Sequence, residues 1–173
     1  MRLLRIPLAG LALAGFLLAL WVHVSALRAI DVSRTWPQVW SLHVGLFAVF
    51  VPMVLVSRRI LGRRPTMRQW RELLPGPIAL MCGALFIYAL VNFLVSLREL
   101  DEGSPAVRGG QFVLQEHGRV TPVSADRYEA AKATQLRMFS GHWMFFYFLP
   151  FSFFAFGLAP RTGSGTPPGT GRR

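Results

Sequence analysis

Long apolar runs alternate with shorter charged segments along this chain. Four of the runs reach about the 20 residues that a helix needs to cross a hydrocarbon core of roughly 30 Å. They cover residues 7–27, 37–57, 77–97 and 141–159. Each is expected to be α-helical, because backbone groups inside a bilayer have no water to bond and must pair within the segment. The pattern predicts an all-α integral membrane protein with four transmembrane helices.

Charge divides the segments between these runs into two classes. Residues 1–6, 58–76 and 160–173 hold 11 basic residues and one acidic residue, whereas residues 28–36 and 98–140 hold eight basic and seven acidic residues. Basic loops remain in the cytoplasm. We therefore expect a cytoplasmic N-terminus, a basic cytoplasmic loop and a cytoplasmic tail in the first class, and two outer loops in the second.

Composition supports the membrane class and suggests a source. Charged residues make up 16% of the chain, below the roughly 25% typical of soluble domains. Of the 19 basic residues 18 are arginine, a bias that favours a bacterial, GC-rich genome. The expected location is thus the cell inner (plasma) membrane, with a multi-pass chain and both termini cytoplasmic.

The N-terminus allows a second interpretation. "MRLLR", the following apolar run and "VSA" at residues 24–26 are the parts of a cleavable signal peptide. The apolar stretch is longer than the usual 7 to 15 residues of such a peptide. An uncleaved first span is therefore favoured, and cleavage would leave three spans in the same orientation.

The basic loop at residues 58–76 is expected to contact anionic lipid headgroups. Met67, Trp70 and Leu74 share one helical face, which predicts a short interfacial helix, with a solvated linker as the alternative. The net charge of +11 lies almost entirely on this side of the membrane, so lipid and not nucleic acid is the predicted partner. The predicted headgroup ligands are Arg58, Arg59, Arg63, Arg64, Arg68 and Arg71.

The outer loop at residues 98–140 is predicted to be a small extracytoplasmic β-hairpin followed by a helix. Two β runs, at residues 111–115 and 119–123, flank a turn at residues 116–118. Ser124 can cap the helix, and the hairpin is expected to pack on that helix or on the membrane.

The tail at residues 160–173 is rich in Gly, Pro and Thr and is predicted to be disordered.

Polar residues within the spans give the candidate site. Ionisable residues there are costly and often functional, and the topology places three histidines near the outer surface. Tyr88, Asn92 and Ser96, spaced at i, i+4 and i+8, form an inward polar stripe that reaches the same region. The candidate site residues are His23, His43, Tyr88, Asn92, Ser96 and His142. Interfacial histidines are the favoured interpretation, ahead of a proton or substrate path and of bound metal or haem.

The fourth run is aromatic on every side from Trp143 to Phe156. Such a surface favours lipid contact and packing over a quinone or lipid groove. Pro150 inside the run should kink the helix or free a carbonyl, which hints at a site or hinge.

The sequence contains no motif that identifies an activity. It lacks metalloprotease, nucleophile-elbow, phosphate-loop and dinucleotide-binding patterns, and Cys82 is its single cysteine. We expect a non-catalytic accessory or interaction protein without a cofactor, which contacts a membrane protein partner through its outer loop. The alternative is a redox protein that binds haem or copper, or a transporter of protons or small solutes, using the outer histidines.

Overall fold

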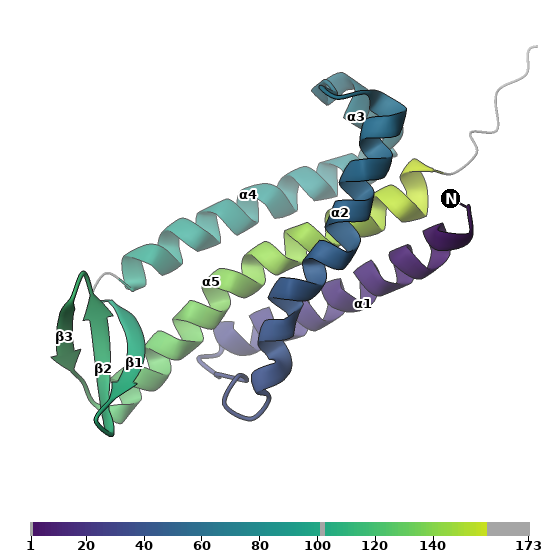
Figure 1. Ribbon diagram of the computed structural model, residues 1–173. Coiled ribbons are helices and arrows are strands. Elements are labelled where there is room, and N and C mark those ends of the chain that lie inside the picture. The colour runs from purple at the N-terminus through teal and green to yellow at the C-terminus, as the bar shows by residue number, and fades with distance from the viewer. Residues whose placement is uncertain (1, 101–102, 159–173) are drawn as a thin grey trace, which may run out of the picture.

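The computed structural model describes residues 2–100 and 103–158 as a helical bundle with a small sheet at one end (Figure 1). Helices α1, α4 and α5 run side by side, and α2 crosses them at a steep angle. The sheet forms one end of the bundle, and α3 and the N-terminus lie at the other. We refer to these as the sheet end and the α3 end. The elements are α1 (Arg2–Leu27), η1 (Pro37–Trp40), α2 (Ser41–Leu61), α3 (Met67–Leu73), α4 (Gly76–Glu99), β1 (Ser104–Arg108), β2 (Gln111–Glu116), β3 (Arg119–Pro122), α5 (Ala125–Ser152) and η2 (Phe153–Gly157).

Among the described residues, three helical segments are long and apolar enough to cross a membrane: Leu3–Leu27, Pro37–Leu61 and Gly76–Glu99. The first three predicted spans are confirmed at this level, although their ends differ from the prediction. Pro7 lies inside α1 and does not begin it, and residues 37–40 form the 3₁₀ turn η1 before α2. Helix α5 is not among these segments, and its first half carries charged residues such as Asp126 and Lys132.

The predicted outer helix and the predicted fourth span form one continuous helix. It runs from Ala125 to Ser152 without a turn at Ser140 and Gly141, and it continues as the π-helix η2, which begins three positions after Pro150. The Ser140 hydroxyl donates to the carbonyl of Arg137, 3.2 Å away in the preceding turn. A serine satisfied within its own helix gives the chain no reason to turn there. Ala159 and the predicted disordered tail at residues 160–173 lie outside the described residues.

Helix α5 is the centre of the bundle, packed between α1 and α4 and crossed by α2. Its aromatic run points inward, with Trp143 fully buried and Tyr147 and Phe148 nearly so. The apolar residues of α1 and α4 face mostly outward, as the large exposed fractions of Leu11 and Leu80 illustrate. The packing expected of the aromatic run is therefore present, and its expected lipid contact stays a prediction.

The sheet has three antiparallel strands in the order β1-β2-β3, one more than predicted. Strands β2 and β3 are the predicted hairpin, with its turn at His117 and Gly118. Gly109 and Gly110 both have positive φ and form the tight turn between β1 and β2. Gly103 also has positive φ, and a Cβ there would meet the backbone of Gln115.

The sheet is attached to the first turns of α5. Ser124 caps α5 by accepting a hydrogen bond from the Arg127 amide. The ring of Phe112 in β2 stacks on Tyr128 in α5 with a centroid distance of 4.6 Å, and Leu114 beside it is buried. The hairpin thus packs on the helix, one of the two supports expected from the sequence.

The short helix predicted at the α3 end is present. Thr66 and Gln69 form a reciprocal capping box at its start. Trp70 packs against Phe153 of η2 at 6.2 Å, and Leu74 is buried. Helix α3 therefore packs against η2, which continues α5.

Glycine at position 15 is required for α1 and α5 to meet. A Cβ at Gly15 would overlap the ring of Tyr147, whereas a Cβ at Gly10 would meet no atom within 4 Å. We expect Gly15→Ala to lower the free energy of unfolding by about 1 to 3 kcal/mol through overpacking, and Gly10→Ala to leave it unchanged or raise it slightly. Reversible unfolding in detergent micelles measures both. Equal stability of the two variants would contradict the packing of α5 against α1.

Candidate functional site

Four of the six predicted site residues meet near the sheet end, three of them buried and Tyr88 39% exposed. His23 of α1 is 2% exposed. Its Nε2 lies 2.5 Å from the hydroxyl of Tyr88 on α4, and its Nδ1 lies 2.9 Å from the hydroxyl of Ser140 on α5. Asn92 and Ser96, on the same face of α4 as Tyr88, are also buried. The stripe predicted on α4 does point inward and does reach His23.

Arg137 extends this arrangement and was missed as a site residue. Its guanidinium donates to the Ser96 hydroxyl at 3.3 Å and to a Glu99 carboxylate oxygen at 2.6 Å. Its carbonyl accepts from the Asn92 amide at 3.0 Å. We call this set the His23–Arg137 cluster, and its members are His23, Tyr88, Asn92, Ser96, Glu99, Arg137 and Ser140.

Sequence alone offered one signal for the missed residues. Glu99 continues the α4 stripe three residues after Ser96, and Arg137 lies three residues before Ser140 on α5. Because residues three or four apart share a helical face, Glu99 extends the stripe on α4 and Arg137 lies on the face of Ser140, although the Glu99 side chain is 45% exposed. The prediction treated them only as charges of an outer loop.

A glycine permits the close approach of the three helices. A Cβ at Gly141 would lie 2.5 Å from the Asn92 amide nitrogen and 3.6 Å from Cε1 of His23. The sequence suggested that Gly141 marks the membrane boundary. In the structure it is the point at which α5 contacts α1 and α4 together.

The buried polar groups of the cluster are all hydrogen-bonded. Among the described residues, no buried side-chain nitrogen or oxygen lacks a hydrogen-bond partner. Both ring nitrogens of His23 are engaged by hydroxyls. Because the Ser140 hydroxyl donates its single proton to the Arg137 carbonyl, Nδ1 of His23 donates to Ser140 and Nε2 accepts from Tyr88. A ligand at His23 would therefore have to displace Ser140 or Tyr88. This geometry is that of a polar clamp between helices, with a short hydrogen-bonded path from Ser140 to the partly exposed Tyr88.

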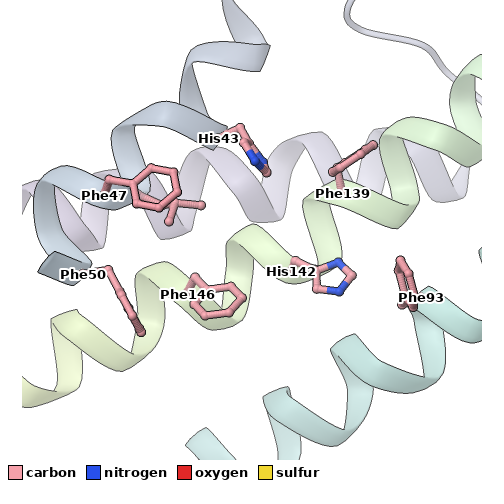
Figure 2. A pocket seen from close by; sticks show the side chains of 8 residues that line it. His43, Phe47, Phe50, Phe93, Phe139, His142 and Phe146 are labelled. Carbon is pink, nitrogen blue, oxygen red and sulfur yellow. The ribbon is translucent and has the colours of Figure 1, made fainter. Parts of the chain in front are cut away.

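His43 and His142 lie elsewhere, around a separate cavity of about 320 Å³ between α2, α4 and α5 (Figure 2). His43 of α2 and His142 of α5 face this cavity together with aromatic rings from all three helices. Phe93 packs edge-on against His142 with a centroid distance of 5.0 Å. The remaining lining residues are Leu46, Phe47, Phe50, Phe139 and Phe146. The candidate residues thus form two groups and not one shared site.

Hydrogen bonds fix the tautomers of these two histidines. The indole N–H of Trp143 can only donate, and it lies 3.1 Å from Nδ1 of His43, which must therefore accept. The carbonyl of Met138 can only accept, and it lies 2.9 Å from Nδ1 of His142, which must donate. Neutral His43 consequently carries its proton on Nε2. Neutral His142 carries its proton on Nδ1 and has its lone pair on Nε2. While the Trp143 bond persists, Nε2 of neutral His43 is a donor and not a metal ligand.

No group of three or more His, Cys, Asp or Glu residues with metal-binding geometry occurs within the described ranges.

Of the six predicted headgroup ligands, Arg58 and Arg59 occupy the last turn of α2. Arg63 and Arg64 follow in an exposed link. Arg68 pairs with Glu72 at 2.8 Å. Arg71 belongs to α3, and its side chain lies outside the described part of the chain.

Removing the hydrogen bonds of His23 should destabilise the bundle. His23→Phe retains an aromatic ring but removes two interhelical hydrogen bonds, each worth about 1 kcal/mol between membrane helices. We expect a loss of about 2 kcal/mol in the free energy of unfolding, measured in detergent. His142→Phe is the matched control, because the Met138 carbonyl that loses its side-chain partner still accepts a backbone hydrogen bond within α5. This variant should change the free energy of unfolding by less than about 0.5 kcal/mol. Similar losses of stability in both variants would contradict a stabilising role for the two His23 hydrogen bonds.

The comparisons with known proteins supply no relative. No protein-family model, curated protein or solved structure matches the chain. Function therefore has to follow from the residues and contacts described above.

Proposed function

We propose that this chain is a multi-pass protein of a bacterial inner membrane that acts as a non-catalytic accessory protein and contacts a partner through its sheet. In this proposal α1, α2, α4 and α5 all cross the bilayer, both termini are cytoplasmic and the sheet is outside. The mostly outward-facing apolar residues of α1 and α4 support insertion, because exposed apolar surfaces of this extent need a lipid or protein cover.

The fourth crossing is supported by the position and length of α5. It runs beside α1 and α4, so its second half shares their depth. Its 28 residues give a length of about 42 Å, which exceeds the roughly 30 Å of a hydrocarbon core. The excess accommodates the charged first turns, which carry the sheet beyond the bilayer.

The orientation is supported by the separation of charges. The N-terminus and α3 lie at one end of the bundle, where four arginines follow one another closely at the end of α2 and in the link after it. At the sheet end, acidic partners accompany the basic residues, as in the pair Arg34–Glu129 at 3.2 Å. The positive-inside rule then makes the α3 end cytoplasmic.

The single observation that carries the accessory role is the outer edge of β3. All four of its residues are exposed, and in the three-stranded sheet β3 is an edge strand. The amide of Val123 donates to the carbonyl of Phe112, so by alternation the backbone groups of Val120 point away from β2. Pro122 occupies another outward position, where its missing N–H costs no ladder bond. A short free edge fixed to a central helix is suited to pairing with an extended segment of another protein.

A photoreactive residue at Val120 tests this role. Benzoylphenylalanine at Val120, irradiated in intact cells, is expected to give a discrete cross-linked product of higher mass. The same residue at Ile30, which is also exposed and belongs to the other outer loop, should give none. Val120→Pro removes the outward N–H without breaking a hydrogen bond between β2 and β3, and it should abolish co-purification of the partner. Val120→Thr keeps this N–H and should keep co-purification. No product from Val120, or equal products from both positions, would contradict the proposal.

The second candidate function rests on the cavity of Figure 2. His43 and His142 from different helices line one aromatic-walled space, and paired imidazoles of a helical bundle are ligands for haem or copper. This redox alternative requires His43 to give up its bond with Trp143. Protein purified from its native membrane should be colourless and free of stoichiometric metal if the accessory role is correct. A haem absorption band, or copper lost on His43→Phe and His142→Phe, would favour the alternative.

A further inference from the structure

A groove of about 970 Å³ opens at the α3 end between α1, α2 and the last turns of α5. We call it the inner groove. It is distinct from the His23–Arg137 cluster and from the cavity of Figure 2, with which it shares no residue. Its lining residues are Arg5, Ile6, Ala9, Gly10, Leu13, Val56, Arg59, Ile60, Phe151, Phe154, Ala155 and Leu158.

The groove is apolar along its length and charged at one end. From Arg5 to Leu13 it follows nine residues of α1, a rise of about 12 Å along the helix axis. That length approaches the roughly 15 Å depth of one leaflet. A Cβ at Gly10 would meet no atom within 4 Å, so the wall is open to an occupant there. Ile6 is exposed, and Ile60 opposite on α2 is exposed as well.

Arg5 is a fixed charge in the groove wall. Its guanidinium donates to the carbonyls of Phe154, Leu158 and Ala155 at 2.6, 3.1 and 2.7 Å. These are the terminal carbonyls that a helix end leaves without an internal partner. Three of its five N–H groups are thereby used, and the other two remain available. Arg5 both caps the end of η2 and holds a positive charge at the mouth of the groove.

Arg59 supplies a second charge that is not neutralised. It is exposed in the last turn of α2 and makes no ion pair with any described residue. The acidic residue nearest in sequence, Glu72, is already paired with Arg68. Two arginines above an apolar channel are complementary to a molecule with an anionic head and a hydrocarbon chain.

We propose that the inner groove is a binding site for one anionic phospholipid. An acyl chain lies along Ile6, Gly10 and Leu13 of α1, and the phosphate contacts Arg59 and the free N–H groups of Arg5. The bound lipid covers the apolar wall between α1 and α2, which meet closely only towards the sheet end (Figure 1). This inference rests on the proposed membrane insertion.

Native mass spectrometry of the full chain released from nanodiscs tests the site. With equal phosphatidylglycerol and phosphatidylcholine, we expect one retained phosphatidylglycerol per chain. Arg59→Gln should reduce its retention about five-fold, from about 1 kcal/mol per basic residue near the surface. Arg64→Gln removes the same charge from the exposed link outside the groove and should have little effect. Equal losses in the two variants would show headgroup attraction without a site and would overturn the proposal.

A steric variant tests the channel independently of charge. Gly10→Phe projects a ring into the open wall and should abolish retention of the lipid without lowering expression. Gly83→Phe, at a glycine on α4 with equally open surroundings, is the matched control and should retain the lipid. Unchanged retention in Gly10→Phe would overturn the proposal. A chain found in the membrane fraction that binds no lipid would refute only the site, whereas a chain absent from that fraction would refute the proposed function.

Discussion

The whole bundle depends on placing a partly polar helix at its centre. Helix α5 packs between α1 and α4 although it is the least apolar of the long helices. Its arginine and serine can enter only where other helices offer matching groups, because a buried polar group without a partner is costly. His23 supplies that match from α1, and the Tyr88, Asn92 and Ser96 stripe supplies it from α4. The hydrogen bonds select one register for three helices that apolar packing alone would leave free to slide.

The same requirement explains which residues are small. Gly15 on α1 makes room for Tyr147, and Gly141 on α5 makes room for Asn92 and His23. Tyr147 also donates to the carbonyl of Leu42 at 2.9 Å, which joins α2 to the centre. Close backbone approach and a few interhelical hydrogen bonds are the typical means of association for membrane helices, since lipid gives apolar side chains no preference for one another.

Periodicity predicted the helices and the inward stripe, because apolar length and i, i+4 spacing are local properties of the chain. Strand β1 was missed because Pro105 and the two following turn glycines interrupt any alternating pattern, and its pairing with β2 is fixed only in three dimensions. Arg137 and Glu99 were assigned to an outer loop because charge was counted by segment and not by helical face. Arg5 was counted only as a terminal charge, since its contacts lie about 150 positions away in the sequence. Which histidines share a site likewise depends on helix crossing, which the sequence does not encode locally.

The proposed topology requires α5 to cross the membrane and to link an outer sheet to an inner end. In a Cys82→Ala background, single cysteines at Thr121, Arg64 and Ser164 can be labelled in intact cells with a maleimide that does not cross the inner membrane. We expect labelling at Thr121 in intact cells, and labelling at Arg64 and Ser164 only after the inner membrane is permeabilised. Labelling of Thr121 and Ser164 from the same side would show that α5 does not cross, and would overturn the proposed topology.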